Sequence, residues 1–216
     1  MEVILIAPSQ QHLFAAELDQ AFALRHKVFN HQMGWGLPHR NGRESDVYDG
    51  HAWHLMAFDM PGRLAGYWRL TPSTHRNLTA EVFGDLFESG AAPSDPYVWE
   101  LSRYAIDGDQ FAGRTQTMKK LMLAMGCGLM EFAILHGITE LLSVQDDHIA
   151  RHTSTLLGDP EWVSETRDYG ATNATCYAYA PSLERLYALR VRYNLGTPVL
   201  SQYHLTMPTL QRAAAA

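Results

Sequence analysis

The sequence predicts a single α/β (α+β) domain built on a mixed β-sheet with flanking helices. Apolar runs of strand length alternate with stretches of helical periodicity along the chain, which is typical of such domains. The 216 residues fit one large domain, and 46% hydrophobic with 19% charged residues suffices for an ordinary core. No repeat or linker-like stretch divides the chain. We therefore expect one domain over residues 1–212 and an alanine tail at 213–216.

The composition argues against several classes of function. The net charge is −6 and no basic run is present, so nucleic acid is not expected as the main partner. No apolar run approaches the roughly 18 residues of a membrane span, and no secretory leader precedes the first strand. Cys127 and Cys176 form no CxxC pair, which favours free buried thiols in a reducing compartment. We expect a cytoplasmic protein that does not bind membranes.

The N-terminal part predicts a strand followed by a long helix. Residues 3–7 form the strand, Pro8 and Ser9 break it, and Ser9 is placed to cap a helix from about residue 10 to 29. Arg25 lies in the apolar register of that helix. Because an unpaired buried charge is costly, its guanidinium needs carboxylate partners. The apolar face consists of Phe14, Leu18, Ala21, Phe22, Arg25, Val28 and Phe29.

Residues 25–49 run from the helix end into a long polar loop, around which we expect the chain to be organised. A loop of this length without a helix or strand pattern is usually functional or disordered. The large apolar residues favour an ordered, functional loop, because disordered segments rarely carry so many of them. They are Val28, Phe29, Met33, Trp35 and Tyr48, and the loop also carries the acids Glu44, Asp46 and Asp49.

The middle of the chain predicts three strands. Residues 53–59 and 64–70 are joined by a Pro-Gly turn at 60–63. Residues 73–96 are irregular, with short helical pieces, and residues 97–106 read as a central strand. Glu100 and Arg103 interrupt that strand, and alternation places them on opposite faces. Either each residue ties the sheet to another charge, or one of them lines a cleft, and both interpretations stay open.

The C-terminal part predicts two further strand–helix units. A helix begins at Gly113 and Thr115 and ends near residue 136, before Gly137. Its methionine-rich stripe suits a core, and flexible methionines also suit an acyl pocket. A strand at 140–145, a helix capped by Asp146 or Asp147 and strands at 162–166 and 175–180 follow. The last helix spans 181–192, with Pro181 at its first position.

The charged residues are the unusual feature of the sequence. The pairs His148/His152 and His51/His54 lack an acid or cysteine at ligand spacing, so we predict no metal site. An ionic network within apolar segments either staples the loop to the sheet or holds a zwitterionic ligand. Two aromatics of the loop, Phe29 and Trp35, suit a flat ring and a cationic centre. The network consists of Arg25, Glu44, Asp46, Asp49, Arg69, Glu100 and Arg103.

Five short motifs in the first half of the chain resemble the acyl-homoserine lactone synthases, the quorum-sensing autoinducer synthases. Their order and spacing match the family. They are R-x-x-V-F at 25–29, G-W at 34–35, E-x-D-x-Y-D at 44–49, R-L-x-P-[ST] at 69–73 and W-E-x-S-R at 99–103. The second half is similar in its order of elements.

The resemblance implies a fold related to the N-acetyltransferases, with a central cleft in a mixed sheet. It implies two substrates, S-adenosylmethionine and an acyl thioester of acyl carrier protein or coenzyme A, and no cofactor. The amine of the methionine moiety attacks the thioester carbonyl. The methionine carboxylate then closes on its own γ-carbon, which expels methylthioadenosine and forms the lactone.

The resemblance also implies roles for individual residues. Glu100 or Asp49 is the candidate base, and backbone N–H groups around Arg103 and Tyr104 stabilise the oxyanion. Residues 1–110 bind adenosylmethionine, through or beside Arg25, Phe29, Trp35, Glu44, Asp46, Arg69 and Tyr104. Residues 111–212 provide most of the acyl and carrier sites. The expected acyl pocket is Leu101, Met122, Met125, Leu142 and Ser143, and the expected carrier contacts are Lys119, Lys120 and Arg114.

Two other functions compete with this reading. An ordinary N-acyltransferase using acetyl-coenzyme A explains the fold and Glu100, but not the combination of Phe29, Trp35 and the acid cluster. A non-catalytic module that binds an acyl group or adenosylmethionine would tolerate loss of Glu100 or Arg103, and both are present. The sequence therefore favours an active synthase and leaves the acyl chain, its carrier and the oligomeric state open.

Overall fold

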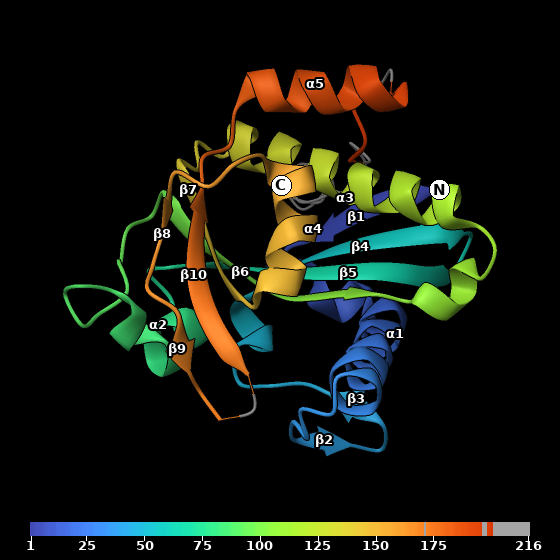
Figure 1. Ribbon diagram of the computed structural model, residues 1–216. Coiled ribbons are helices and arrows are strands. Elements are labelled where there is room, and N and C mark those ends of the chain that lie inside the picture. The colour runs from blue at the N-terminus through green and yellow to red at the C-terminus, as the bar shows by residue number, and fades with distance from the viewer. Residues whose placement is uncertain (171, 196–197, 201–216) are drawn as a thin grey trace, which may run out of the picture.

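The computed structural model describes residues 1–170, 172–195 and 198–200, so the end of the expected domain and the alanine tail lie outside the described residues. One sheet of eight strands has the order β1-β4-β5-β6-β7-β10-β8, and β9 pairs with β10 (Figure 1). Strands β6 and β7 are parallel, and the other pairs in this sheet are antiparallel. The predicted mixed sheet is confirmed. Its strands are Glu2–Ile6, Trp53–Met60, Arg63–Pro72, Val98–Ile106, Glu140–Gln145, Trp162–Val163, Arg167–Asp168 and Asn173–Tyr179 for β1, β4, β5, β6, β7, β8, β9 and β10.

Helices cover both faces of the sheet. Helix α1 (Ala15–Arg25) packs on one face, and α3 (Thr115–Leu135) packs on the other (Figure 1). Helices α4 (Asp147–Leu157) and α5 (Leu183–Tyr193) lie on the α3 side. Strand β1 illustrates the two layers, because Ile4 and Ile6 join the α1 core while Val3 and Leu5 join the α3 core. Among the described residues, no helix is both long and apolar enough to cross a membrane.

The predicted helix at 10–29 is three consecutive helical pieces. A 3₁₀ helix spans Pro8–Leu13, α1 follows, and a π-helix continues over His26–Gln32. The prediction that Ser9 caps the helix is wrong, because Ser9 lies inside the 3₁₀ turn and the α-helix begins at Ala15. The expected burial of Arg25 is confirmed, since its exposed fraction is 0%.

The loop after the π-helix contains a small hairpin. Strands β2 (His39–Arg40) and β3 (Arg43–Glu44) pair across Asn41 and Gly42. Both turn residues have positive φ, 49° and 70°, as a two-residue type I′ hairpin requires. The hairpin carries Glu44 toward α1, so this part of the loop has regular structure that the sequence analysis did not predict.

Strand β6 has a bulge at the point where it separates from β7. Tyr67 on β5 pairs with Ala105, whereas Arg69 pairs with Ser102, and Arg103 between them has φ 59°. The extra residue turns Arg103 to the α1 face, the face of Glu100. The prediction that alternation places Glu100 and Arg103 on opposite faces is therefore wrong. The described β6–β7 pairing covers Val98–Glu100, after which the two strands diverge.

Local capping explains the remaining helices. Gly113 (φ 70°) precedes α3 and Gly137 (φ 66°) follows it, as predicted. The Asp146 side chain accepts a hydrogen bond from the Ile149 N–H and caps α4, which is one of the two predicted choices. Ser182 caps α5 in the same way, so the prediction that Pro181 occupies the first helical position is wrong, and Pro181 precedes the cap.

A short helical region lies between β5 and β6. Helix α2 (Leu78–Val82) and a 3₁₀ turn at Gly84–Leu86 occupy the stretch predicted to be irregular with short helical pieces. Asn77 caps α2 by accepting from the Ala80 N–H. Two further 3₁₀ turns are Asp49–His51, which connects the loop to β4, and Gly108–Phe111, which connects β6 to α3.

Candidate active site

Arg25 is the centre of a buried ionic cluster. It projects from the last turn of α1, and its Nε lies 2.5 Å from Glu44 Oε2 while its Nη1 lies 2.6 Å from Asp49 Oδ1. Asp46 is more distant, at 3.8 Å from Nη2. Glu44 and Asp49 are only 1% and 6% exposed, so these are charge-assisted bonds in a desolvated environment. The expected carboxylate partners of Arg25 are thus the acids of the following loop.

Arg69 on β5 extends the cluster toward β6. Its Nη1 lies 2.5 Å from Asp46 Oδ1 and 3.0 Å from Asp49 Oδ1, and its Nε donates to Ser102 Oγ at 3.0 Å. Glu100 Oε1 lies 4.0 Å from Arg69 Nη2. The side chain of Arg69 is fully buried. This arginine therefore links the loop acids to the residues of the central strand.

Arg103 connects the cluster to a pair of aromatic rings. Its Nε lies 3.3 Å from Glu44 Oε1 and its Nη2 lies 3.0 Å from Asp46 Oδ2. Its guanidinium lies over the Phe29 ring, 5.7 Å from the centroid. Phe29 in turn stacks on Trp35 with centroids 5.3 Å apart and an interplanar angle of 13°. One continuous surface of planar and cationic groups is thus formed by Arg103, Phe29 and Trp35.

The electrostatic environment fixes the charge of Asp49 and the neutrality of His54. Burial raises the pKa of Asp49, but Arg25 and Arg69 outweigh it and lower that pKa to about 2. Burial lowers the pKa of His54 to about 4, so this imidazole is neutral at pH 7. His54 Nδ1 lies 2.8 Å from the Tyr67 hydroxyl, and the Tyr67 ring centroid lies 5.6 Å from the Arg25 guanidinium. Asp49 is therefore a permanent anion with a weak affinity for protons.

Glu100 is held by different partners from those of the loop acids. It is 2% exposed, and its Oε2 accepts a hydrogen bond from the Thr79 N–H at 2.5 Å in the first turn of α2. Its Oε1 accepts from the Ser102 hydroxyl at 2.7 Å. No arginine donates a hydrogen bond to it in the described part of the chain. Glu100 is accordingly less tightly neutralised than Asp49.

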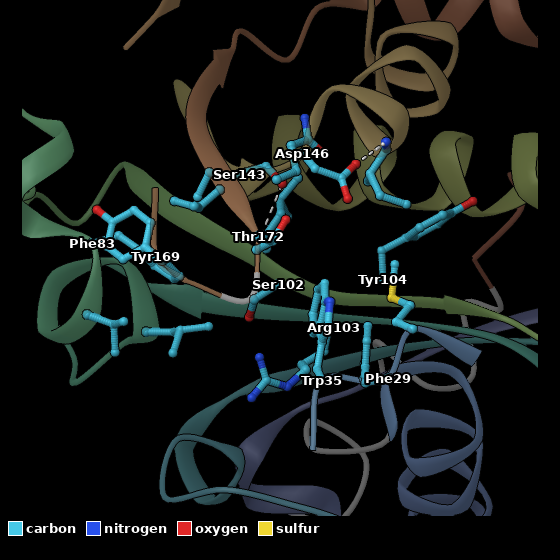
Figure 2. Close-up of a pocket in the computed structure, with 18 of the residues that line it drawn as sticks. Phe29, Trp35, Phe83, Ser102, Arg103, Tyr104, Ser143, Asp146, Tyr169 and Thr172 are labelled. Carbon is cyan, nitrogen blue, oxygen red and sulfur yellow. Dashed lines mark hydrogen bonds between the residues drawn. The ribbon is translucent and has the colours of Figure 1, made fainter. Parts of the chain in front are cut away.

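A cavity of about 370 Å³ opens where β6 and β7 diverge, a volume in the range of small-molecule sites. On the α1 side it is lined by Phe29, Met33, Trp35, Leu37, Ser102 and Arg103. On the α3 and α4 side it is lined by Trp68, Leu101, Tyr104, Ser143, Gln145, Asp146 and Ile149. Figure 2 shows Phe29, Trp35 and Arg103 below the opening and Ser143, Asp146 and Thr172 above it. The cavity therefore joins the two faces of the sheet.

Two segments far apart in sequence meet at the remote end of the cavity. The rings of Phe83 and Tyr169 make an edge-to-face contact with centroids 4.8 Å apart (Figure 2). Asp85 accepts a hydrogen bond from the Tyr169 hydroxyl and lies 3.2 Å from Arg167 Nη1. The α2 region and the β9–β10 region thus close this end together.

The structure places only some of the predicted site residues at the cavity. Of the seven charged positions, Arg103 lines the cavity, whereas the other six lie in the cluster behind it. Leu101 and Ser143 line the cavity, and Ser143 Oγ donates to the Leu101 carbonyl at 3.3 Å. Tyr104 also lines it, on the α3 side rather than beside Trp35.

Three residues expected in the acyl pocket are not among the cavity residues. Met125 is fully buried against β5, where a Cβ on Gly66 would lie 2.5 Å from its sulfur. Leu142 is 1% exposed in a separate core cluster, and Met122 packs against the core under α3. Lys119, Lys120 and Arg114 are exposed at the beginning of α3. The tight contact at Gly66 shows that Met125 belongs to the core.

Sequence reasoning missed several cavity residues. Ser102 lies within the matched W-E-x-S-R motif, and its place between Glu100 and Arg103 was the available signal. Trp68, Phe83 and Tyr169 gave no comparable signal, because they reach the cavity through packing between distant segments. Among the described residues, no group of three His, Cys, Asp or Glu side chains is arranged to hold a metal ion.

Comparison with known proteins gives consistent matches. The profile of the autoinducer synthase family matches residues 9–165. An isovaleryl-homoserine lactone synthase of Bradyrhizobium diazoefficiens is 32% identical over 175 residues, 77% of each chain. A CoA-dependent acyl-homoserine lactone synthase solved with SAM and isopentyl-CoA has a TM-score of 0.80 and 25% identity, covering 93% of this chain and 92% of that one.

A solved structure with lower sequence identity shares the same fold. An acyl-CoA N-acyltransferase from Pseudomonas aeruginosa has a TM-score of 0.56 and 18% identity, and the match covers 83% of this chain and 100% of that one. At this identity the likeness concerns the fold alone. It confirms the predicted relation to the N-acyltransferase fold.

Proposed function

The chain belongs to the autoinducer synthase family, and we propose how its cavity carries out the family's reaction. It is an acyl-homoserine lactone synthase, which transfers an acyl group from a thioester to the amine of S-adenosylmethionine and releases methylthioadenosine. The observation that carries the proposal is the cavity at the division of β6 from β7. One side offers stacked aromatics with Arg103, and the other offers an apolar channel.

In this proposal adenosylmethionine binds on the α1 side of the cavity. The Phe29–Trp35 stack contacts its adenine or sulfonium, because aromatic faces favour both flat rings and cations. Arg103, the cluster residue that lines the cavity, binds the methionine carboxylate. Five other charged residues hold the loop that carries Phe29 and Trp35 and act on the substrate indirectly: Arg25, Glu44, Asp46, Asp49 and Arg69.

Ser102 and Glu100 form the proposed path for the proton of the substrate amine. The Ser102 hydroxyl lines the cavity and donates to Glu100 Oε1 at 2.7 Å. As the amine attacks the thioester carbon, Ser102 accepts a proton from nitrogen and passes its own proton to Glu100. The C–N bond forms, the C–S bond breaks, and the thiolate leaves with a proton from the site. Asp49, with a pKa near 2, is the weaker candidate for the base.

The second step needs positioning more than acid–base chemistry. The methionine carboxylate attacks its own γ-carbon, the ring C–O bond forms, and the C–S⁺ bond breaks to release neutral methylthioadenosine. Because the sulfonium is already a good leaving group, a fixed conformation supplies most of the rate. Arg103 suits this role, since Glu44 and Asp46 hold its guanidinium beside Phe29. Backbone N–H groups near Arg103 and Tyr104 remain our candidates for the oxyanion site.

A coenzyme A thioester with a short acyl group is the donor we propose first. The support is the likeness to a CoA-dependent synthase and to an isovaleryl-homoserine lactone synthase. Lys119, Lys120 and Arg114, exposed at the start of α3, are proposed to meet the anionic carrier. Residues 1–110 supply most of the adenosylmethionine side, and residues beyond 111 add Ser143 and Ile149 to the acyl side. We propose a cytoplasmic location, where both substrates are made.

The test is a product assay by mass spectrometry. Purified protein receives adenosylmethionine with each of a series of acyl-CoA and acyl carrier protein thioesters, and methylthioadenosine and lactone are followed together. We expect equimolar products with one class of thioester and none without thioester. Ser102→Ala should lower kcat, whereas the exposed control Ser94→Ala should not. An acylated amine other than a homoserine lactone would contradict the proposal.

A further inference from the structure

Residues 33–37 form part of the cavity wall on the α1 side, although they belong to no helix or strand. Three alternate side chains of this segment line the cavity, namely those of Met33, Trp35 and Leu37. Gly34 and Gly36 lie between them and have positive φ, 71° and 62°. Glycine has more backbone freedom than any other residue. The segment therefore owes its shape to the contacts that hold it.

The first half of the segment is held by the preceding π-helix. The Met33 N–H donates to the Val28 carbonyl, and the Trp35 N–H donates to the Phe29 carbonyl, both at 2.9 Å. Within the described part of the chain, Leu37 makes no hydrogen bond with another backbone group. The second half of the segment therefore depends on a side chain.

That side chain is Asn30, which follows Phe29 in the π-helix. Asn30 Nδ2 donates to the Leu37 carbonyl at 2.8 Å, and Asn30 Oδ1 accepts a hydrogen bond from the Leu37 N–H at 3.0 Å. One side-chain amide thus pairs both backbone groups of Leu37, as the backbone of a neighbouring strand would. The same Nδ2 lies 3.1 Å from His39 Nδ1 on β2. Asn30 therefore fixes the end of the segment against the π-helix.

Trp35 lies between the two points at which the segment is held. Its indole stacks on Phe29 with centroids 5.3 Å apart, and Figure 2 shows both rings below the opening of the cavity. A ligand gains most from this stack when the rings are in place beforehand, because ordering side chains during binding costs affinity. Since glycines flank Trp35, loss of the bonds to Leu37 would release the indole from a single position.

We propose that Asn30 is a positioning residue for adenosylmethionine, because it holds Leu37 and so keeps Trp35 stacked on Phe29 before the substrate binds. This inference rests on the proposed function, in which that stack contacts the adenine or the sulfonium. Asn30 is not among the residues that line the cavity, so its effect reaches the substrate through the segment 33–37. Its contribution to affinity should therefore disappear when the indole is removed.

The experiment is a double-mutant cycle of Asn30→Ala and Trp35→Ala. Isothermal titration calorimetry gives the Kd for S-adenosylmethionine without thioester, and methylthioadenosine release gives kcat and the KM for the thioester. Asn30→Asp passes through the same cycle, because it keeps the acceptor for the Leu37 N–H and loses the donor. Gln32→Ala is the matched control. Gln32 carries the same amide group in the same π-helix, is exposed and makes no side-chain hydrogen bond in the described part of the chain.

Asn30→Ala should raise the Kd for S-adenosylmethionine about fivefold, the size of one ordinary hydrogen bond. The KM for the thioester and kcat at saturation should stay within about twofold of wild type. In the Trp35→Ala background the same substitution should change the Kd by less than about twofold, because residues that act through one contact are not additive. Asn30→Asp should raise the Kd in the same way, and Gln32→Ala should leave it unchanged.

Two results would overturn the role of Asn30 alone. One is an unchanged Kd in the Asn30 variants of a protein whose wild type binds S-adenosylmethionine. The other is an equal rise in Kd in the Trp35→Ala background, which would show that Asn30 supports the fold in general. A wild-type protein that neither binds S-adenosylmethionine nor releases methylthioadenosine would refute the proposed function itself.

Discussion

Replacing each of the two candidate bases by its amide separates catalysis from stability. Glu100→Gln and Asp49→Asn make the same change of charge within one cluster of three arginines and four carboxylates. Each variant brings that cluster from one excess negative charge to balance. The two variants differ in the bonds they break, and the structure predicts opposite consequences from that difference.

Asp49→Asn should destabilise the protein and leave the chemistry largely intact. Asp49 lies 2.6 Å from Arg25 Nη1 and 3.0 Å from Arg69 Nη1, and it also accepts from the Asp46 N–H at 2.7 Å. Its pKa falls from 3.8 to about 2, which corresponds to about 2.5 kcal/mol at ~1.4 kcal/mol per pKa unit. The neutral amide forfeits most of that stabilisation. This contribution exists above pH 3.8 and is lost as the pH falls toward 2.

Glu100→Gln should abolish most activity and change stability little. The amide oxygen still accepts from the Thr79 N–H, and the amide NH₂ donates to Ser102 Oγ. The nearest arginine nitrogen is 4.0 Å away, so a weak ion pair is lost. Removal of a general base typically costs a factor of about 10²–10⁴ in kcat. We expect that loss, with a free energy of unfolding within about 1 kcal/mol of wild type.

The measurement pairs kcat for methylthioadenosine release with urea unfolding at pH 7.5 for wild type and both variants. Saturating adenosylmethionine and thioester keep binding effects out of kcat. The reasoning is refuted if Asp49→Asn is inactive at wild-type stability while Glu100→Gln retains its activity. That outcome would make Asp49 the base and Glu100 a purely structural acid.

Three further predictions follow from the same geometry. Arg25→Met should lower the free energy of unfolding by about 3–5 kcal/mol in urea titrations, because the buried Glu44 and Asp49 lose their shortest ion pairs and keep only the longer ones to Arg103 and Arg69; wild-type stability would contradict this. His54 has a pKa of about 4 when folded and ~6.5 when unfolded. The unfolded chain therefore binds the proton first, and stability should fall by up to about 3 kcal/mol as the pH drops from 6.5 to 4, a slope that His54→Gln removes. Trp35→Ala should raise the KM for adenosylmethionine about fivefold to tenfold while Trp35→Phe restores it; an unchanged KM would remove Trp35 from the site.

The sequence predicted the ionic partners of Arg25 because a buried guanidinium without carboxylate partners is energetically costly. Arg25 falls on an apolar helix face, and the acids that follow it are the nearest means of compensating its charge. The sheet was predictable for a similar reason, since strand-length apolar runs leave few alternatives. The Asn41-Gly42 turn is a strong hairpin signal as well, but the strands beside it have two residues each and are too short to show an alternating pattern.

Other features depended on packing that no local pattern records. The π-helix at His26–Gln32 has only seven residues, and its two buried positions, Val28 and Phe29, are too few to show a period different from that of an α-helix. The methionine stripe that includes Met125 has the same sequence pattern whether it faces a pocket or a core. The close approach of Gly66 to Met125 shows that Met125 faces the core. Phe83 and Tyr169 meet because two loops close on each other, which only the tertiary structure specifies.

The bulge at Arg103 explains why the protein keeps a buried ionic cluster in place of an apolar one. A left-handed backbone at a residue with a side chain costs about 1–2 kcal/mol. An apolar cluster of equal volume would stabilise the fold as well or better. It would not, however, stabilise the Arg103 side chain on the α1 face. Glu44 and Asp46 stabilise it there, because they bind the guanidinium at 3.3 and 3.0 Å. Since Glu44 also binds Arg25, the acid that positions the loop is the acid that positions Arg103. The geometry of the cavity and the order of the loop are therefore one property of this cluster, and a change at Glu44 should disturb both together.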